Sequence, residues 1–370
     1  MKPVLLPSDY LAQCYSENYS EAHHKFKLQC SSAVGLSHYQ EFVYPQTGPN
    51  AEPLATAIAW QGNPNAEKVL VLQSATHGVE GFAGSAIQLD TLQKRTEHTL
   101  APDVAILYIH AINPYGFAWL RRVNEQGIDL NRNFIDFTQP LPDNPGYAQL
   151  ADNLLPEKIS DMQSASPSLD AYRKAFGQQA LESAISGGQY QFAEGLFYGG
   201  TEPSQSRLNL QQIITDYNLG QRNSVAVIDI HSGLGPFGYG EVICDHPPGS
   251  AGVTLARQWY GESVTEPALG NSTSVPKQGL IDYLWHPLGE QVCFVTLEFG
   301  TYSIEQMFDV LRQDHILHRN SVDWPASETK KIKSNIRKVF YPASADWQEM
   351  VLLRGRQCVR QALQGLSNPI

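Results

Sequence analysis

A histidine and a glutamate three positions apart, His77 and Glu80, follow an apolar run at residues 69–72. Imidazole nitrogens and carboxylate oxygens are ligands that zinc accepts, so this pair could hold a metal ion. The spacing alone is a weak signal, because about one such match is expected by chance from 11 histidines and 37 acidic residues among 370. The other match, His38 with Glu41, lies in a polar stretch, and we expect His38 at the surface.

Two further groups that could do chemistry stand at the ends of apolar runs. His231 follows residues 225–230, and Glu298 lies near the end of the run that begins at Val292. By itself, the histidine is slightly better explained as a core residue. A carboxylate in an apolar strand is costly unless it has a partner or a function, and a structural ion pair or a helix N-cap would be enough.

The position that these groups share favours a single site. In an open α/β sheet, ligands bind in the crevice outside the carboxyl ends of the strands. His77, Glu80, His231 and Glu298 all fall there if each apolar run is a strand. Two imidazoles and one carboxylate form a three-ligand zinc set with a position left for water. A further carboxylate is the general base that such a site needs, so we expect one Zn²⁺ per chain.

Three arginines, Arg121, Arg122 and Arg132, lie close together in an otherwise acidic chain. Arginine binds carboxylates through two parallel hydrogen bonds and can stabilise an oxyanion. The segment could therefore supply a substrate handle and an electrophilic group. The alternative is a solvated helix face with ion pairs to Glu125 and Asp129.

The elements that must position these residues form an alternating pattern. Four runs rich in β-branched and aliphatic residues are expected to be buried strands, at 69–72, 104–109, 225–230 and 292–297. Helical stretches are expected at 84–93, 304–312 and 346–363. Because the strands are almost continuously apolar, both faces of the sheet should be covered. The expected fold class is α/β, with a mixed, mostly parallel twisted sheet flanked by helices.

Residues 138–220 differ from the rest of the chain. They are rich in Gln, Ser and Pro and contain no run that is typical of a strand. Ser166-Pro167 is a good helix start, and Leu169, Tyr172 and Phe176 would then share one helical face. A second helix is expected at 208–218. We interpret 138–220 as a helical insertion within a single metallohydrolase domain that covers residues 1–370.

Composition excludes several classes of protein. With 42% apolar and 17% charged residues the chain is typical of an ordered globular protein, and its net charge of −11 argues against nucleic-acid binding. Five scattered cysteines without a C-x-x-C pair indicate a reducing compartment. The first residues lack the apolar run of a signal peptide. The sequence also has no apolar stretch of about 18 residues, the length that would predict a membrane span. We expect a cytoplasmic protein; its oligomeric state stays open.

The motifs together resemble a known family. Asn113-Pro-x-Gly, Arg122-x-Asn124 and Gly127-Ile-Asp-Leu-Asn-Arg-Asn-Phe134 closely resemble the signature of zinc metallocarboxypeptidases, including the succinylglutamate desuccinylase/aspartoacylase branch that shares the same core. His77-x-x-Glu80 upstream and His231 downstream follow the family's order. The resemblance covers about residues 69–300 and points to a bacterial-type subgroup.

The resemblance implies a role for each residue. His77, Glu80 and His231 would ligate Zn²⁺, Glu298 would be the general base, Arg122 rather than Arg121 would polarise the scissile carbonyl, and Asn131 with Arg132 would clamp a substrate carboxylate. The implied activity is hydrolysis of peptide or amide bonds next to a free carboxylate, in a small peptide. An N-acyl amino acid deacylase is the alternative. A non-catalytic carboxylate-binding protein is less favoured, because binding alone needs neither Glu298 nor Arg122.

Two other readings of the sequence fail in detail. Residues 233–238 match G-x-G-x-x-G after an expected strand, but Pro236 does not open a helix and no acidic residue follows about 20 positions on. No G-x-S-x-G elbow of a serine hydrolase is present. The family usually has a tyrosine that closes over the substrate. None aligns here, and we expect ordinary packing for the candidates Tyr239, Tyr283 and Tyr302.

Overall fold

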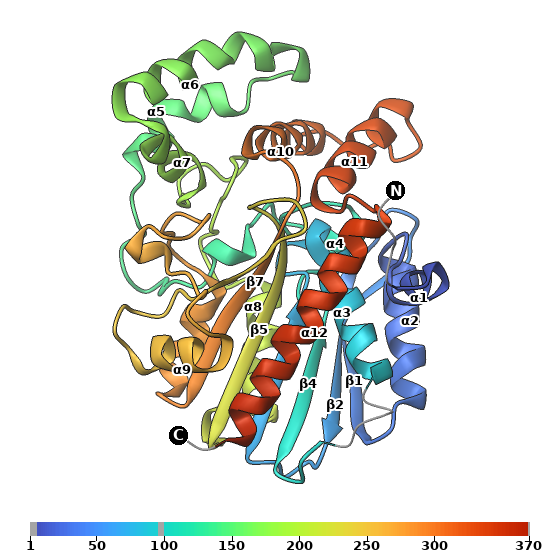
Figure 1. Ribbon diagram of the computed structural model, residues 1–370. Coiled ribbons are helices and arrows are strands. Elements are labelled where there is room, and N and C mark those ends of the chain that lie inside the picture. Colours follow the sequence, from blue (N-terminus) through green and yellow to red (C-terminus); the bar gives the residue numbers. More distant parts are fainter. Residues whose placement is uncertain (1–5, 95–99, 369–370) are drawn as a thin grey trace.

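The structure is a computed structural model and describes residues 6–94 and 100–368. Residues 1–5, on which the expected lack of a signal peptide partly rests, lie outside the described residues. A seven-stranded sheet in the order β1-β2-β4-β3-β5-β7-β6 forms the centre of the molecule (Figure 1). Its strands are β1 Leu36–Thr47, β2 Pro53–Gly62, β3 Lys68–Ser74, β4 Val104–His110, β5 Ser224–Gly233, β6 Gly240–Ile243 and β7 Val292–Gly300.

The central strands β4, β3, β5 and β7 run parallel, whereas β2 pairs antiparallel with β4 and β1, and β6 pairs antiparallel with β7. The predicted mixed, mostly parallel α/β fold is confirmed. The four expected strands are the four parallel ones, and they are almost entirely buried. The other three were not anticipated. Strand β1 is largely exposed and has no apolar run, β2 contains small residues, and β6 is only four residues long.

Helices cover both faces of the sheet (Figure 1). They are α1 Ser8–Cys14, α2 Tyr19–Ser32, α3 Gly81–Lys94, α4 Pro114–Ala118, α5 Pro145–Leu154, α6 Met162–Phe176, α7 Gln178–Ser186, α8 Gln205–Asp216, α9 Ala251–Tyr260, α10 Ile304–His318, α11 Ser327–Phe340 and α12 Ala345–Ser367. The expected helices at 84–93, 304–312 and 346–363 are confirmed as parts of α3, α10 and α12. The helix expected at 208–218 overlaps α8, which ends two residues earlier, at Asp216. No described helix combines the length and apolar character that crossing a membrane requires.

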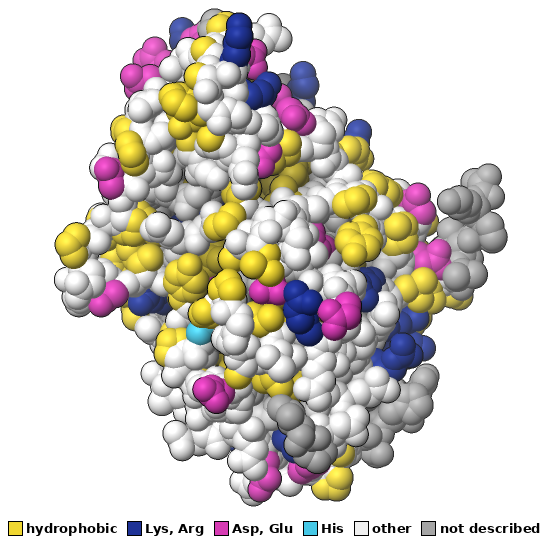
Figure 2. All heavy atoms as spheres, turned by 60° about the vertical axis from the view of Figure 1, so that its left-hand side comes forward, with side chains coloured by type: hydrophobic (Ala, Val, Ile, Leu, Met, Phe, Trp, Pro, Cys, Tyr) yellow, Lys and Arg dark blue, Asp and Glu magenta, His cyan; other side chains and the backbone are white. Residues whose placement is uncertain are grey.

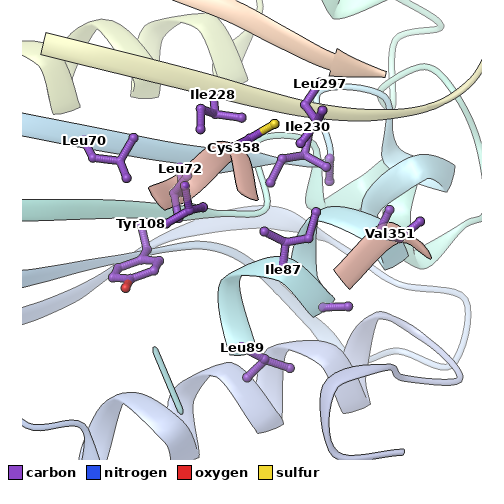
Figure 3. Packing of buried hydrophobic residues seen from close by; sticks show 14 of the residues in the cluster. Leu70, Leu72, Ile87, Leu89, Tyr108, Ile228, Ile230, Leu297, Val351 and Cys358 are labelled. Atoms are coloured by element: carbon purple, nitrogen blue, oxygen red, sulfur yellow. The ribbon is translucent and has the colours of Figure 1, made fainter. Parts of the chain in front are cut away.

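Alternate residues of each central strand face opposite layers. Leu70 and Leu72 point to one face and belong to the same apolar cluster as Ile87 of α3 and Val351 and Cys358 of α12 (Figure 3). On the other face, alternate strand residues such as Val69 and Val71 form a second apolar cluster with α8, in which Ile213 is buried. Both faces are therefore covered, which explains the near-continuous apolar runs.

Helices α5, α6 and α7 form a lobe above the carboxyl ends of the parallel strands (Figure 1). They contact one another and share an apolar cluster with α10 and α11. The predicted start of the first helix at Ser166-Pro167 is wrong, because α6 begins at Met162 and contains Pro167 in its interior. Proline is tolerated best in the first turn, because further along it removes one hydrogen bond and its ring crowds the carbonyl four residues before. Helix α6 nevertheless contains Pro167 in its interior, so proline does not define a helix start uniquely.

Candidate metal centre

The three predicted zinc ligands meet at the carboxyl ends of β3 and β5. His77 precedes the short 3-10 helix Gly78–Glu80, and His231 lies near the end of β5. One ligand atom from each of His77, Glu80 and His231 lies within 4.8 Å of the others, and all three residues are buried. Glu80 Oε1 is 3.0 Å from His77 Nδ1, and Glu80 Oε2 is 3.1 Å from His231 Nδ1. His231 Nδ1 is also 3.1 Å from His77 Nδ1, so the donors face one point.

Two aspartates hold the opposite edges of the imidazole rings. His77 Nε2 lies 3.2 Å from Asp129 Oδ1, and His231 Nε2 lies 2.6 Å from Asp229 Oδ2. Both aspartates are buried, and Asp229 also accepts the hydroxyl of Thr76. A carboxylate on the far nitrogen fixes the tautomer in which Nδ1 presents its lone pair, as in carboxylate–histidine–metal sites. The donor set therefore fits a zinc ion.

The charges of the cluster support the same reading. Although burial favours the neutral carboxyl, the two histidines outweigh it and hold the pKa of Glu80 far below its usual range. For His231, burial favours the neutral ring, but Asp229 and Glu80 raise its pKa well above the usual value. A bound cation would replace the proton that this negatively charged cluster otherwise attracts to His231.

The backbone after α4 positions the turn that carries Glu80. The carbonyls of Arg121 and Arg122 accept the N–H groups of Val79 and Gly78, at 2.8 and 3.2 Å. A Cβ at Gly78 would come within 2.0 Å of the backbone of Gly116, so only glycine allows this approach. The Asn113-Pro-x-Gly and Arg122-x-Asn124 motifs thus lie against the metal turn.

Glu298 lies beside the three ligand residues. It is paired in register with His231 across β5 and β7, and its Oε1 accepts the N–H of Leu234 at 3.0 Å. Burial, followed by the negative charge of Glu80, raises the pKa of Glu298 to about 8. The carboxyl therefore holds a proton more strongly than an ordinary glutamate.

The adjacent residues Arg121 and Arg122 point to different partners. Arg122 lines the cavity, donates from Nε to Asp129 at 2.8 Å and lies 3.2 Å from Glu80 Oε1. Arg121 is not among the cavity-lining residues and pairs with Asp314 of α10 at 2.9 Å. The sequence left a solvated helix face as the alternative, with ion pairs to Glu125 and Asp129. The ion pair with Asp129 is present, but Arg122 is largely buried, so the face is not solvated.

Asn131 and Arg132 also line the cavity. Asn131 Oδ1 accepts the N–H of Ile281 at 2.8 Å, which leaves the amide NH₂ for another partner. Arg132 donates to the carbonyls of Ser186 and Asn131 through Nε and both terminal nitrogens. Of its five N–H groups, one on each terminal nitrogen stays uncommitted, which is the number that a two-bond carboxylate contact uses.

These groups open into one cavity of about 1340 Å³, part of it open to solvent. Hydrophobic side chains gather between the lobe and the body of the molecule (Figure 2). Two charged residues that the sequence reading missed, Asp245 and Lys277, line the same cavity. Among the described residues, the Asp245 carboxylate makes no hydrogen bond or ion pair. Burial, followed by the charge of Arg132, lowers the pKa of Lys277 to about 8.

The missed residues differ in the signal that the sequence offered. Asp229 interrupts an apolar run two positions before His231, and the cost of a buried carboxylate could have identified it. Asp129 stands inside the most specific motif, but the sequence alone suggests only a surface ion-pair partner for the arginines. Asp245 follows only the short apolar stretch 242–244, which is a weak strand signal, and Lys277 belongs to an irregular segment in which nothing local marks it.

Other candidates from the sequence lie away from the cavity. His38 is exposed on β1, as expected. Tyr239 and Tyr283 are exposed and Tyr302 is half-buried against Phe237, and none of these tyrosines lines the cavity. The glycine-rich segment 233–238 leads from β5 to β6 without an intervening helix, unlike a dinucleotide-binding turn.

The fold resembles that of carboxypeptidase A from Helicoverpa armigera, with a TM-score of 0.54 and 12% identity over 96% of this chain and 74% of that chain. An aspartoacylase family protein from Mesorhizobium loti gives a TM-score of 0.38 and 14% identity over 78% of this chain and 68% of that one. Murein-tripeptide amidase MpaA from Escherichia coli O157 gives a TM-score of 0.34 and 18% identity over 77% of this chain and 93% of that one. At these identities the likeness concerns the fold alone.

No curated protein sequence matches the chain. Residues 15–354 match the model of a family described as protein of unknown function, DUF2817. That match spans most of the chain. The matched residues form a carboxypeptidase-like fold and contain a buried His-x-x-Glu…His cluster that is consistent with a single zinc site. The chain therefore belongs to the DUF2817 family, and its structure is similar to the zinc carboxypeptidase superfamily that its motifs resemble.

Proposed function

We propose that this protein is a zinc-dependent hydrolase of peptide or amide bonds next to a free carboxylate. The observation that carries the proposal is the buried set of two Nδ1 atoms and one carboxylate, with Glu298 directly beside it. A protein that only binds carboxylates needs no further buried carboxylate beside such a cluster. Hydrolysis is therefore favoured over simple binding.

A Zn²⁺ ion held by His77, Glu80 and His231 would supply Lewis acidity and lower the pKa of a bound water to about 7. The remaining work falls to the chain's own side chains. Glu298 takes a proton from the attacking water and passes it to the amine nitrogen as the C–N bond breaks. Arg122 donates hydrogen bonds to the carbonyl oxygen as negative charge develops there, a contribution of about 3 kcal/mol per donor.

The substrate's carboxylate has a matching partner in Arg132. Its two uncommitted N–H groups and the NH₂ of Asn131 can hold a carboxylate, while Ser186 keeps the guanidinium in place. Asp129 and Asp229 keep the histidine rings oriented, and Asp129 also orients Arg122. Hydrolysis of a C-terminal peptide bond and deacylation of an N-acyl amino acid use this same arrangement. A small peptide is the first substrate that we would test.

The test uses zinc-loaded protein and pairs of N-blocked dipeptides that differ only in a free or an amidated C-terminus. We expect about one zinc per chain by elemental mass spectrometry, loss of that zinc in His77→Ala, and cleavage at least tenfold faster for the free carboxylate. Small N-acyl amino acids form a second set that identifies a deacylase. Protein that takes up no zinc, or that cleaves none of these amides when loaded, would refute the proposal.

A further inference from the structure

A large part of the cavity wall is apolar and has no role in the reaction proposed above. It is formed by the lobe and by α10. The residues concerned, which we call the apolar wall, are Leu169, Leu181, Ile304, Met307, Phe308 and Leu311. All except Ile304 belong to one apolar cluster. Polar side chains of the lobe, among them Arg173, Gln178 and Glu182, also line the cavity; Arg173 and Gln178 are exposed and Glu182 is half-buried.

The apolar wall adjoins the catalytic side of the metal cluster. A Cβ placed on Gly233 would lie 3.0 Å from the sulfur of Met307 and 3.5 Å from Glu298 Oε1. Met307 of α10 is thus close to the end of β5, which carries His231, and to Glu298 of β7. Arg132 is held by the carbonyl of Ser186, the last residue of α7, and lies near Asp129 and Arg122, so the carboxylate-binding pair borders the lobe end of the cavity.

This arrangement leaves room for a substrate to extend beyond the metal cluster. With its carboxylate at Arg132 and its scissile carbonyl at the metal donors, a substrate can extend its acyl portion past Gly233 to α10. We propose that this acyl portion is a large apolar group that packs against the apolar wall. The proposal rests on the proposed function and specifies its substrate class: amides that combine a free carboxylate with an extended aliphatic or aromatic acyl group.

The energetic reason is the cost of leaving the apolar wall in water. Small-molecule sites are usually lined by apolar side chains with a few placed polar groups, as here. Burying one CH₂ group is worth about 0.8 kcal/mol, which corresponds to roughly a fourfold gain in kcat/KM for each methylene that contacts the wall. An acetyl group would leave most of this gain unused.

The test measures kcat/KM of the zinc-loaded protein for N-acetyl, N-butanoyl, N-hexanoyl and N-octanoyl derivatives of one amino acid. A second arm compares blocked dipeptides that have glycine or phenylalanine before the C-terminal residue. We expect at least a tenfold rise along the acyl series or from glycine to phenylalanine, and the arm that rises identifies an aliphatic or a peptide substrate. Values that stay flat or fall in both arms would overturn the proposal.

Binding provides a readout that does not depend on turnover. Kd values for the same acyl series and dipeptide pair are measured by calorimetry on zinc-loaded Glu298→Gln. In the set of compounds whose kcat/KM rises with acyl size, Kd should decrease with acyl size. If no amide is cleaved by the wild type, the proposed function fails, yet a Kd that falls tenfold or more still supports the apolar wall. A Kd independent of acyl size in both arms rejects the wall, whatever the activity.

A matched pair of variants locates the effect. Ile304 on the wall is 37% exposed and Leu353 on α12, outside the cavity, is 39% exposed. Aspartate at position 304 stands in the first turn of α10, where a negative charge is favourable, so folding should survive. In the arm that rises, Ile304→Asp should lower the ratio of large-acyl to small-acyl kcat/KM at least threefold, and Leu353→Asp should leave it unchanged. An equal ratio in both variants contradicts the proposal.

Discussion

The contact between Asp229 and His231 leads to a specific prediction about metal affinity. Asp229 is fully buried, lies 2.6 Å from His231 Nε2 and is fixed by the hydroxyl of Thr76. Asp229→Asn keeps the shape of the side chain but removes its charge, so it weakens the force that holds the ring proton on Nε2. Loss of such a partner costs about 10- to 100-fold in metal affinity, equivalent to roughly 1.4–2.7 kcal/mol.

The assay is competition for Zn²⁺ between the metal-free protein and a chromophoric chelator at pH 7. Asp90→Asn is the matched control. Asp90 is also buried and hydrogen-bonded, to Tyr10 and Arg356, but it lies on α3 and not at the metal cluster. We expect the zinc Kd to rise for Asp229→Asn and to stay at the wild-type value for Asp90→Asn. A Kd for Asp229→Asn within twofold of wild type, or an equal rise in both variants, would show that the reasoning is wrong.

Three further predictions test other parts of the site and fold. Glu298→Gln should bind zinc normally yet lose at least 100-fold in kcat, and substantial remaining turnover would remove Glu298 from the base role. Arg132→Ala should reduce the preference for free over amidated C-termini at least tenfold in kcat/KM, and an unchanged preference would exclude the carboxylate clamp. Burial raises the pKa of Asp314, but Lys333 and Arg121 outweigh it and hold that pKa well below the usual value. The stabilisation is therefore complete above about pH 5 and is lost progressively as the pH falls further. Asp314→Asn should lower the free energy of unfolding by about 3–5 kcal/mol at pH 7 and flatten its decline between pH 5 and 3. Urea unfolding at several pH values measures both, and a parallel decline in variant and wild type would count against it.

Local patterns in the sequence predicted the central sheet and the candidate ligands. Strands β3, β4, β5 and β7 are buried on both faces, so their hydrophobic runs are continuous and easy to find. Because parallel strands end at one edge of a sheet, the residues that follow them come together, and His77, Glu80 and His231 do so. Strand β1 could not be found in this way, since it lies at the edge and alternates weakly.

What only the tertiary structure decided is where each polar side chain in an irregular segment points. Arg121 and Arg122 are neighbours of one type, yet Arg121 turns to Asp314, 193 residues away, while Arg122 turns to Asp129 at the metal cluster. Such choices depend on partners that arrive from distant parts of the chain, and no local propensity encodes them. The apolar wall has the same origin, because it exists only where the lobe meets α10. The residue types and their order came from the sequence alone; their division into ligand, orienting and substrate-facing groups required the fold.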